Sequence, residues 1–132
     1  TDCQTVMHKP ITTTSRTAHI DNPMEMYAGL LYMRYQEDKS TGGDFQIHES
    51  ANQINRVDKT KGRQIFEDDL GPVVTTVPYK ANTFVMFCNS TPNAIHGVTP
   101  RKDAIMYRRS VNIIAEYSRQ SRKTMYSVNE IK

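Results

Sequence analysis

The chain has 132 residues, of which 37% are hydrophobic and 23% are charged, with a formal net charge of +3. These values exclude a disordered or fibrous protein and fit a single globular domain, residues 1–132, that can bury a core. No apolar run approaches the roughly 20 residues that span a bilayer, and no signal-peptide pattern opens the chain, so we expect no membrane partner. Cys3 and Cys88 lie far apart and make no disulfide framework, which favours a reducing, cytoplasmic compartment.

The first part of the chain predicts short extended segments. Residues 1–15 have little periodicity and predict an irregular stretch or an edge strand. Residues 16–20 predict a short strand, and Pro23 marks the loop after it, because proline disfavours helix in the residue before it. The aromatic and apolar stretch 27–36 predicts a buried strand, although a helix fits the same periodicity.

Turn residues and a polar stretch divide the rest of the chain. Residues 38–43 predict a turn, and alternation over residues 44–48 predicts a half-buried strand. Residues 49–71 predict a flexible loop or short strand, where we expect substrate selectivity because variable loops usually carry it. Four more strands are predicted at 73–77, 83–88, 94–98 and 110–117, followed by a short helix or loose tail at 118–132. Short strands without a convincing long helix predict an all-β fold, a sandwich or a barrel.

A His-x-Asp segment predicts part of a metal site. His19 and Asp21 are two residues apart on an extended segment, so their side chains point to the same face. Imidazole and carboxylate together suit Fe(II) or Mn(II), and His96 on a later strand is the candidate third ligand. Two histidines and one carboxylate leave coordination positions open for a bidentate cosubstrate and dioxygen. The alternatives are a surface histidine beside a turn aspartate for the first pair and a core histidine for His96.

Basic residues near the last strand predict an anion site. An iron-bound α-keto diacid must anchor its far carboxylate, and arginine does so through two charge-assisted hydrogen bonds, which a serine hydroxyl can supplement. Arg108 and Ser110 share one face of the strand and Arg109 takes the other. Strand parity alone leaves open which of the two faces looks inward.

Several short motifs follow one another along the chain. They are His19-Ile20-Asp21-Asn22-Pro23, Leu31-Tyr32-Met33, Gly42-Gly43-Asp44-Phe45, Phe84-Val85-Met86-Phe87, His96-Gly97-Val98-Thr99-Pro100 and Arg108-Arg109-Ser110-Val111-Asn112. Their order resembles that of the Fe(II)/2-oxoglutarate-dependent dioxygenases, and most closely the prolyl-hydroxylase-like branch. The resemblance covers roughly residues 16–117.

The resemblance implies an all-β fold with few or no helices, the double-stranded β-helix also called a jelly roll or cupin-like fold. It implies Fe(II) bound by His19, Asp21 and His96, and 2-oxoglutarate bound through Arg108 with a hydrogen bond from Tyr32. The implied reaction hydroxylates a C–H bond and releases succinate and CO2, with ascorbate as a candidate reductant. A plain core aromatic is the alternative role for Tyr32.

Two features depart from the family pattern. The spacing from His96 to Arg108 is slightly longer than usual, which keeps Arg109 open as the anchor for 2-oxoglutarate. The helices that normally precede the first core strand are absent from this chain, so the chain can be the catalytic core of a longer enzyme. Asp21 speaks against the halogenating relatives, which carry a small residue there, and favours hydroxylation or a related desaturation.

Other functions remain open from the sequence. A metal cupin that uses no keto acid would not need Arg108, and a non-catalytic jelly-roll binding module would need none of the metal ligands. After position 100 the chain has eight basic and three acidic residues. This excess of positive charge fits an anionic partner or a solvated surface. Stacking aromatics are not interleaved with them, so nucleic acid is not expected. The substrate is left open between peptidyl proline, an amino acid and a small metabolite.

A few residues near these motifs have two interpretations. His48 could line the mouth of the site or face solvent. Asp44 is expected to cap a turn, and Met24, Glu25 and Met26 could shape a substrate rim or pack as an ordinary loop.

Overall fold

The computed structural model describes residues 1–10, 17–22, 24–51, 57–58, 63–89 and 94–117. Its strands are β1 (Asp2–His8), β2 (Glu25–Tyr32), β3 (Phe45–Ser50), β4 (Val57–Asp58), β5 (Gln64–Ile65), β6 (Leu70–Val77), β7 (Phe84–Cys88), β8 (His96–Val98) and β9 (Arg108–Glu116), with one 3-10 turn, η2 (Glu67–Asp69). Within these ranges there is no helix whose length and hydropathy would let it cross a membrane. The predicted all-β class is confirmed for the described part of the chain.

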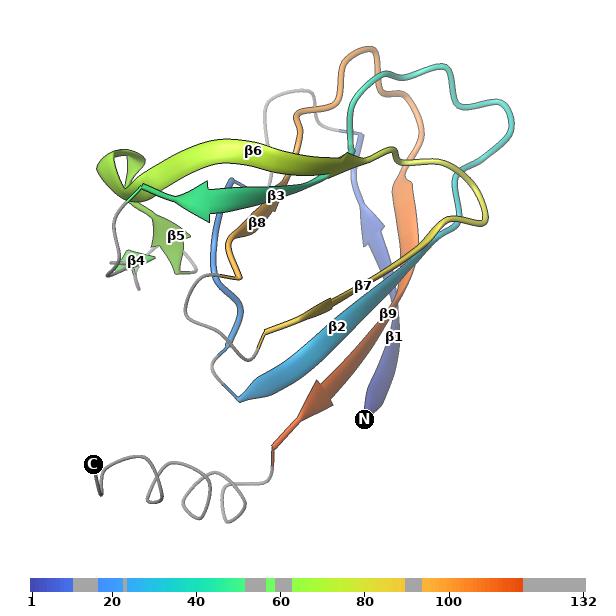
Figure 1. Cartoon of the computed structure of the whole chain (residues 1–132). Helices are drawn as coiled ribbons and strands as arrows, with labels where there is room; N and C mark the ends of the chain where they lie inside the picture. The colour runs from blue at the N-terminus through green and yellow to red at the C-terminus, as the bar shows by residue number, and fades with distance from the viewer. Residues whose placement is uncertain (11–16, 23, 52–56, 59–62, 90–93, 118–132) are drawn as a thin grey trace, which may run out of the picture.

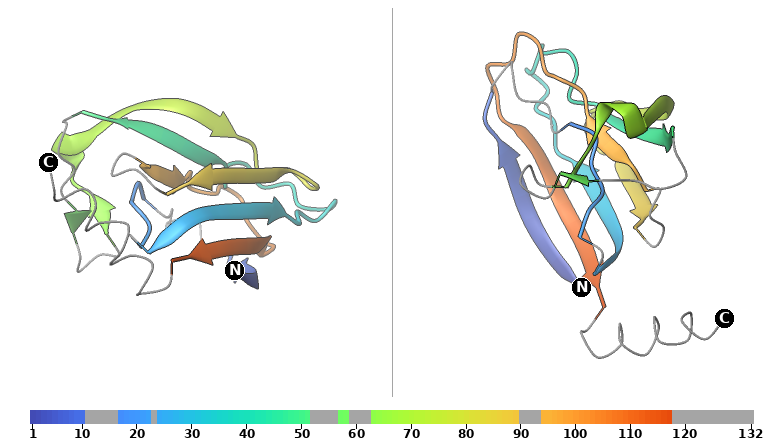
Figure 2. Two further views of the ribbon diagram at one scale, coloured as in Figure 1. Left: turned by 60° about the horizontal axis from the view of Figure 1, so that its bottom comes forward. Right: turned by 90° about the vertical axis from the view of Figure 1, so that its left-hand side faces the viewer.

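The strands form two antiparallel sheets that face each other (Figure 1). The first sheet has the order β1-β9-β2-β7 and the second the order β6-β3-β8. Beyond β8, backbone bridges from His19 to His96 and to Gln64 join the segment at His19 and then β5 to the second sheet. From β6 to β9 successive strands alternate between the sheets, and β1 lies at the edge of the first (Figure 2), which is consistent with a jelly-roll-like fold.

Some strands differ in position or extent from the sequence predictions, because pairing with distant segments determines where they form. Within residues 49–71, which we expected to be a loop or short strand, lie β4, β5 and η2, and β6 already begins there. The backbone N–H of Ile65 donates to the carbonyl of Ala18, a long-range partner that the local polar sequence cannot reveal. The strand expected over 27–36 ends at Tyr32, and the tail expected at 118–132 lies outside the described residues.

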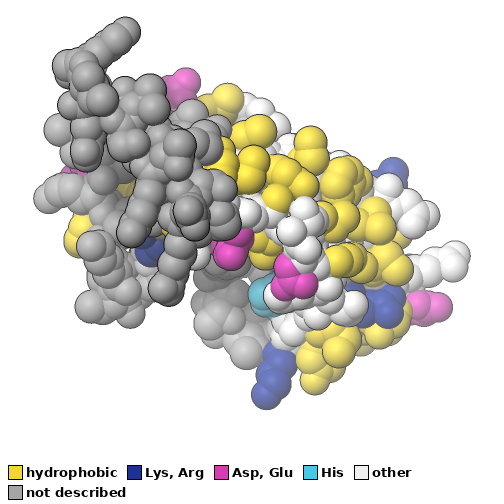
Figure 3. All heavy atoms as spheres, turned by 90° about the horizontal axis from the view of Figure 1, so that it is seen from below, with side chains coloured by type: hydrophobic (Ala, Val, Ile, Leu, Met, Phe, Trp, Pro, Cys, Tyr) yellow, Lys and Arg dark blue, Asp and Glu magenta, His cyan; other side chains and the backbone are white. Residues whose placement is uncertain are grey.

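Part of the outer face of the first sheet, on β7, is also apolar. On β7, Phe84 and Met86 are exposed and stand opposite Leu31 and Gly29 of β2. Figure 3 shows hydrophobic side chains gathered on the side of the molecule where this sheet lies. Because both faces of β7 are apolar, its sequence lacks the polar alternation of a half-solvated strand.

Two hydrophobic clusters hold the layers together. Tyr32, Phe45, Tyr79 and Val85 form the first cluster, between the sheets. Ile20, Ile65 and Ile95 form the second. Ile20 and Ile95 are chain neighbours of His19 and His96, and neighbouring residues on extended chain point to opposite faces. The second cluster therefore fixes, from behind, the two segments that present the histidines.

The second cluster yields a stability prediction. Ile95 is fully buried, so Ile95→Ala should lower the free energy of unfolding by roughly 2–5 kcal/mol through lost burial and the cavity that remains. Ile105→Ala is the matched control, because this side chain is 79% exposed and its loss should cost less than about 0.5 kcal/mol. Urea unfolding followed by circular dichroism measures both, and equal effects would contradict this account of the core.

Candidate functional site

The two histidines of the predicted metal site form one backbone pair. The N–H of His19 donates to the carbonyl of His96 over 2.8 Å, and the N–H of His96 donates back to the carbonyl of His19 over 3.0 Å. In an antiparallel pair of this kind the two side chains project to the same face of the sheet. Their ring centroids accordingly lie 4.4 Å apart, and both rings are almost fully buried.

Asp21 completes a compact cluster with the two rings. One carboxylate oxygen, Oδ1, lies 3.3 Å from Nε2 of His19, and the other, Oδ2, lies 3.2 Å from Nε2 of His96. One ligand atom from each residue can be chosen so that all lie within 4.8 Å of one another. Burial alone would raise the pKa of Asp21, but hydrogen bonding to both histidines and their charge hold it well below its usual range. The carboxylate is therefore the ionised form that a metal requires.

Backbone carbonyls fix the orientation of both rings. Nδ1 of His19 lies 2.8 Å from the carbonyl oxygen of Thr17, and Nδ1 of His96 lies 3.0 Å from that of Ala94. Because a carbonyl oxygen only accepts, each Nδ1 carries a proton and each Nε2 faces Asp21. Lone pairs on Nε2 would repel the carboxylate, so the cluster needs positive charge, either protons on Nε2 or a bound cation. The donor set fits a divalent metal held by two imidazoles and one carboxylate.

Three neighbours of this cluster have no signal in the motif that predicted it. The side-chain amide of Asn89 donates to Oδ2 of Asp21 over 3.2 Å, which orients the carboxylate. The rings of Phe45 and Phe87 pack on His96 at centroid distances of 5.5 and 4.4 Å. Asn89 follows directly after the apolar β7, and a polar residue at a strand end is the only sequence cue to its role.

The cluster lines a cavity of about 380 Å³. His19, Asp21 and His96 stand on one side of it, and Arg108 and Ser110 of β9 line it as well. The other lining residues are Met7, His8, Lys9, Glu25, Ala28, Leu30, Phe45, Phe87, Val98, Thr99, Arg101, Asn112 and Ile114. The structure thus brings the predicted metal ligands and the predicted anion anchor to the same cavity, whose size suits a small ligand.

Arg108 is a buried cation that lacks an anion within the described chain. Only 5% of its surface is exposed, and its Nε donates to the carbonyl of Gly43 over 3.0 Å. Among the residues that the structure describes, none gives its Nη2 a hydrogen-bond partner and no carboxylate forms an ion pair with it. Burial lowers the pKa of Arg108 below its ordinary value, which reflects the cost of keeping this charge out of water. Buried charges are normally paired, so the site calls for an anionic ligand.

Two tyrosines form the surroundings of Arg108. Its guanidinium carbon lies 4.9 Å from the ring centroids of both Tyr32 and Tyr79. Tyr32 is fully buried in the first core cluster and does not line the cavity. Burial raises the pKa of its hydroxyl, and the charge of Arg108 only partly opposes that rise. Tyr32 is therefore a core aromatic beside the candidate anchor, and its expected hydrogen bond to 2-oxoglutarate stays a prediction.

The pairing of β9 decides which arginine faces inward. Arg108, Ser110 and Asn112 line the cavity, and Ser110 donates from its hydroxyl to Oδ1 of Asn112 over 2.7 Å. Arg109 points the other way, where its Nε donates to the carbonyl of Met33 and its guanidinium lies 3.4 Å from the ring centroid of Tyr35. Of the two anchors left open by the sequence, only Arg108 is placed in the cavity.

The remaining candidates lie elsewhere or play other parts. His48 does not line the cavity, and neither do Met24 and Met26, whereas Glu25 does. Asp44 does more than cap a turn, because its Oδ1 accepts a hydrogen bond from the backbone N–H of Tyr79 across the molecule.

Comparisons of the chain with models of protein families, with curated proteins and with solved structures found no match. The functional interpretation therefore depends on the side chains described above.

The two buried arginines that line the cavity should respond differently to removal. Arg101→Met should lower the free energy of unfolding by roughly 3 kcal/mol, because it takes the nearest cation, at 2.9 Å, from the buried carboxylate of Asp38. Arg108→Met should leave the stability of the ligand-free protein unchanged or raise it, because it removes a buried charge without a carboxylate partner. Urea unfolding tests the pair, and an equal loss in both variants would show that Arg108 is a structural residue.

Proposed function

We propose that the protein is an Fe(II)- and 2-oxoglutarate-dependent dioxygenase that hydroxylates a C–H bond of a small-molecule or peptide substrate. In this proposal His19, Asp21 and His96 hold the metal and Arg108 holds the distal carboxylate of 2-oxoglutarate. The observation that carries it is the single cavity lined both by a His-Asp-His cluster and by a buried arginine without a carboxylate partner among the described residues.

The chain's own residues would divide the work. Bound iron and 2-oxoglutarate would supply the oxidation by activating dioxygen, one atom of which enters succinate as the keto acid loses CO2 while the other enters the substrate C–H bond. Nε2 of each histidine and one oxygen of Asp21 would bind the metal, while Asn89 holds the other carboxylate oxygen. Phe45 and Phe87 cover His96 with apolar surface and would keep water from that side of the site.

The anion site separates this proposal from its rivals. A metal cupin that needs no keto acid has no use for a buried arginine in the metal cavity, and the desolvation that lowers its pKa makes such an arginine expensive. A non-catalytic binding module could use Arg108 for an anionic ligand but would not need three convergent metal-binding side chains. Dependence of turnover on both Fe(II) and 2-oxoglutarate favours the dioxygenase, whereas metal binding without such dependence favours a cupin.

Metal binding is the first test. The wild-type protein should bind one Mn(II), an oxygen-stable substitute for Fe(II), and His96→Ala should weaken binding more than about 100-fold, because loss of an outer partner alone weakens it roughly 10- to 100-fold. His48→Ala is the control, since His48 lies outside the cavity and should keep wild-type affinity. Titration followed by electron paramagnetic resonance measures free Mn(II). Equal affinity in both variants would remove His96 from the ligand set.

Cosubstrate binding is the second test. Arg108→Gln should weaken 2-oxoglutarate binding to the Mn(II)-loaded protein roughly 10- to 100-fold, because a hydrogen bond to a charged group contributes about 1.5–3 kcal/mol. Arg109→Gln removes the same charge from the outer face and should change the affinity less than about twofold. Calorimetry gives both dissociation constants, and succinate release with Fe(II) and ascorbate then screens amino acids, metabolites and peptides. The reverse ranking of the two variants would contradict the assignment of Arg108.

A further inference from the structure

Within the described ranges, the carbonyl group of Gly43 accepts a hydrogen bond from the Arg108 guanidinium and helps to set its direction. Nε of Arg108 donates to the carbonyl oxygen of Gly43, and the rings of Tyr32 and Tyr79 flank the guanidinium. The hydrogen bond to Gly43 therefore helps to set the direction in which the remaining N–H groups of Arg108 point toward a ligand. A shift of Gly43 would turn the guanidinium relative to the cavity, and two-pronged recognition of a carboxylate tolerates little rotation.

Gly43 belongs to the loop between β2 and β3, which is tied to the segment after β8. The backbone N–H of Gly43 donates to the carbonyl of Thr99, and Thr41 and Lys102 exchange two backbone hydrogen bonds of 3.1 and 3.0 Å. Gly43 has a φ of +80°, and a Cβ there would lie 3.2 Å from Cγ of Arg101. The residue whose carbonyl accepts from Arg108 therefore packs closely against the side chain of Arg101.

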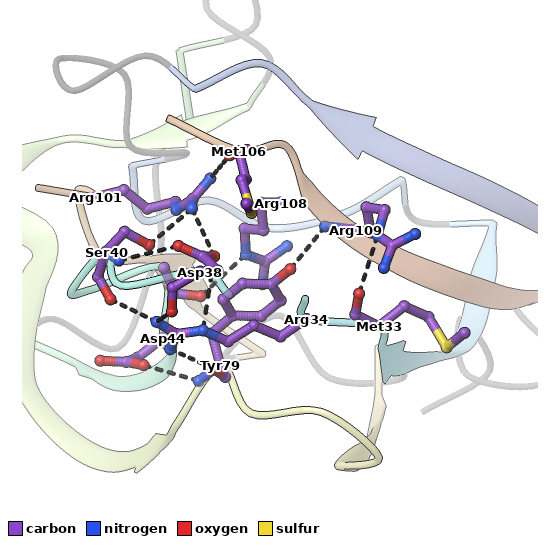
Figure 4. A network of polar contacts seen from close by, with 11 residues as sticks. Met33, Arg34, Asp38, Ser40, Asp44, Tyr79, Arg101, Met106, Arg108 and Arg109 are labelled. Atoms are coloured by element: carbon purple, nitrogen blue, oxygen red, sulfur yellow. Dashed lines mark hydrogen bonds and ion pairs between the residues drawn. The ribbon is translucent and has the colours of Figure 1, made fainter. Parts of the chain in front are cut away.

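A buried carboxylate holds this loop in place (Figure 4). Oδ2 of Asp38 accepts a hydrogen bond of 2.9 Å from Nη2 of Arg101, and the same nitrogen donates to the Ser40 hydroxyl over 2.7 Å. Oδ1 of Asp38 accepts from the backbone N–H of Ser40, and Nε of Arg34 lies 3.6 Å from Oδ2. Burial would raise the pKa of Asp38, but the hydrogen bonds from Ser40 and the charge of Arg101 hold it below its usual range.

Arg34 and Arg101, the two arginines beside Asp38, also make hydrogen bonds outside this loop. Arg34 donates to the carbonyls of Tyr79, Asp38 and Ser40, and Nη1 of Arg101 donates to the carbonyl of Met106, shortly before β9 begins. One carboxylate thus joins the loop that carries Gly43 to the segment that leads into Arg108. The charge of Arg101 is balanced within the network, whereas that of Arg108 is left for a ligand.

We infer that Asp38, with Arg34 and Arg101, is a positioning device for the anion site, because it fixes the Gly43 carbonyl and through it the guanidinium of Arg108. We call these three residues the Asp38 network. The inference rests on the proposed function, since it assigns the network to the binding of the distal carboxylate of 2-oxoglutarate. None of the three would touch the metal.

The direction in which Asp38→Asn changes the affinity for 2-oxoglutarate tests the inference. If the network acted only through charge, removing Asp38 would leave Arg101 uncompensated near Arg108 and would tighten anion binding. If it positions Arg108, the variant should bind 2-oxoglutarate roughly tenfold more weakly, because a small displacement of a binding group costs that much or more. The KM for 2-oxoglutarate should rise by the same factor, while kcat at saturation and the Mn(II) dissociation constant stay within about twofold.

Matched variants separate positioning from a general loss of structure. Asp103→Asn removes the same charge from an exposed residue of the segment before β9 and should leave the 2-oxoglutarate affinity unchanged. Asp38→Glu keeps the carboxylate and should restore part of the affinity. The double variant Asp38→Asn with Arg101→Gln should bind no more weakly than Asp38→Asn alone, because both changes break one unit. Circular dichroism at the assay temperature confirms that each variant is folded.

The possible failures are distinct. A wild-type protein that binds Mn(II) but no 2-oxoglutarate would overturn the proposed function, and the inference with it. Wild-type binding together with unchanged or tighter binding by Asp38→Asn would overturn the inference alone. Weaker binding by Asp38→Asn with partial recovery in Asp38→Glu would support it.

Discussion

The exchange of two backbone hydrogen bonds between His19 and His96 is the constraint on which the candidate site depends. It turns two residues that are distant in sequence into direct neighbours, and strand geometry then sets their rings on one face. Asp21 joins them because it lies two residues further along the same segment. Ile20 and Ile95, on the opposite face, anchor the pair in the core. The distances between the three side chains are therefore set by backbone pairing in the sheet. Asn89 adds one hydrogen bond, which orients the carboxylate of Asp21.

The contrast among four arginines explains what is unusual about the cavity. Arg34 and Arg101 share the carboxylate of Asp38, and Arg109 lies on the outer face over Tyr35. Arg108 alone of these four is buried without a carboxylate among the described residues. A charge in that position lowers the stability of the folded protein unless something else offsets it. Such local costs are typical of functional sites, where a ligand supplies the missing partner.

The sequence predicted the elements of this site better than their surroundings. Alternation and turn residues predicted most of the longer strands approximately, but not β4 and β5, and two-residue spacing sufficed to group His19 with Asp21 and Arg108 with Ser110. The choice between Arg108 and Arg109 needed the pairing of β9 with its neighbours, because parity defines two faces without saying which is inside. Asn89 and the Asp38 network were missed, since their roles depend on loops that meet only in the folded chain.

The candidate metal ligands and the proposed anion anchor come from different sheets. His96 lies on β8 of the second sheet, which the segment at His19 extends, whereas Arg108 lies on β9 of the first. Facing sheets pack about 10 Å apart, so a diacid held at both ends would have to reach across the interior. The separation of its two anchors would then be set by the core between the sheets, where Tyr32 of β2 and Phe45 of β3 belong to one hydrophobic cluster. The first hydrophobic cluster, which packs the two sheets together, is therefore also what separates the two groups of candidate residues.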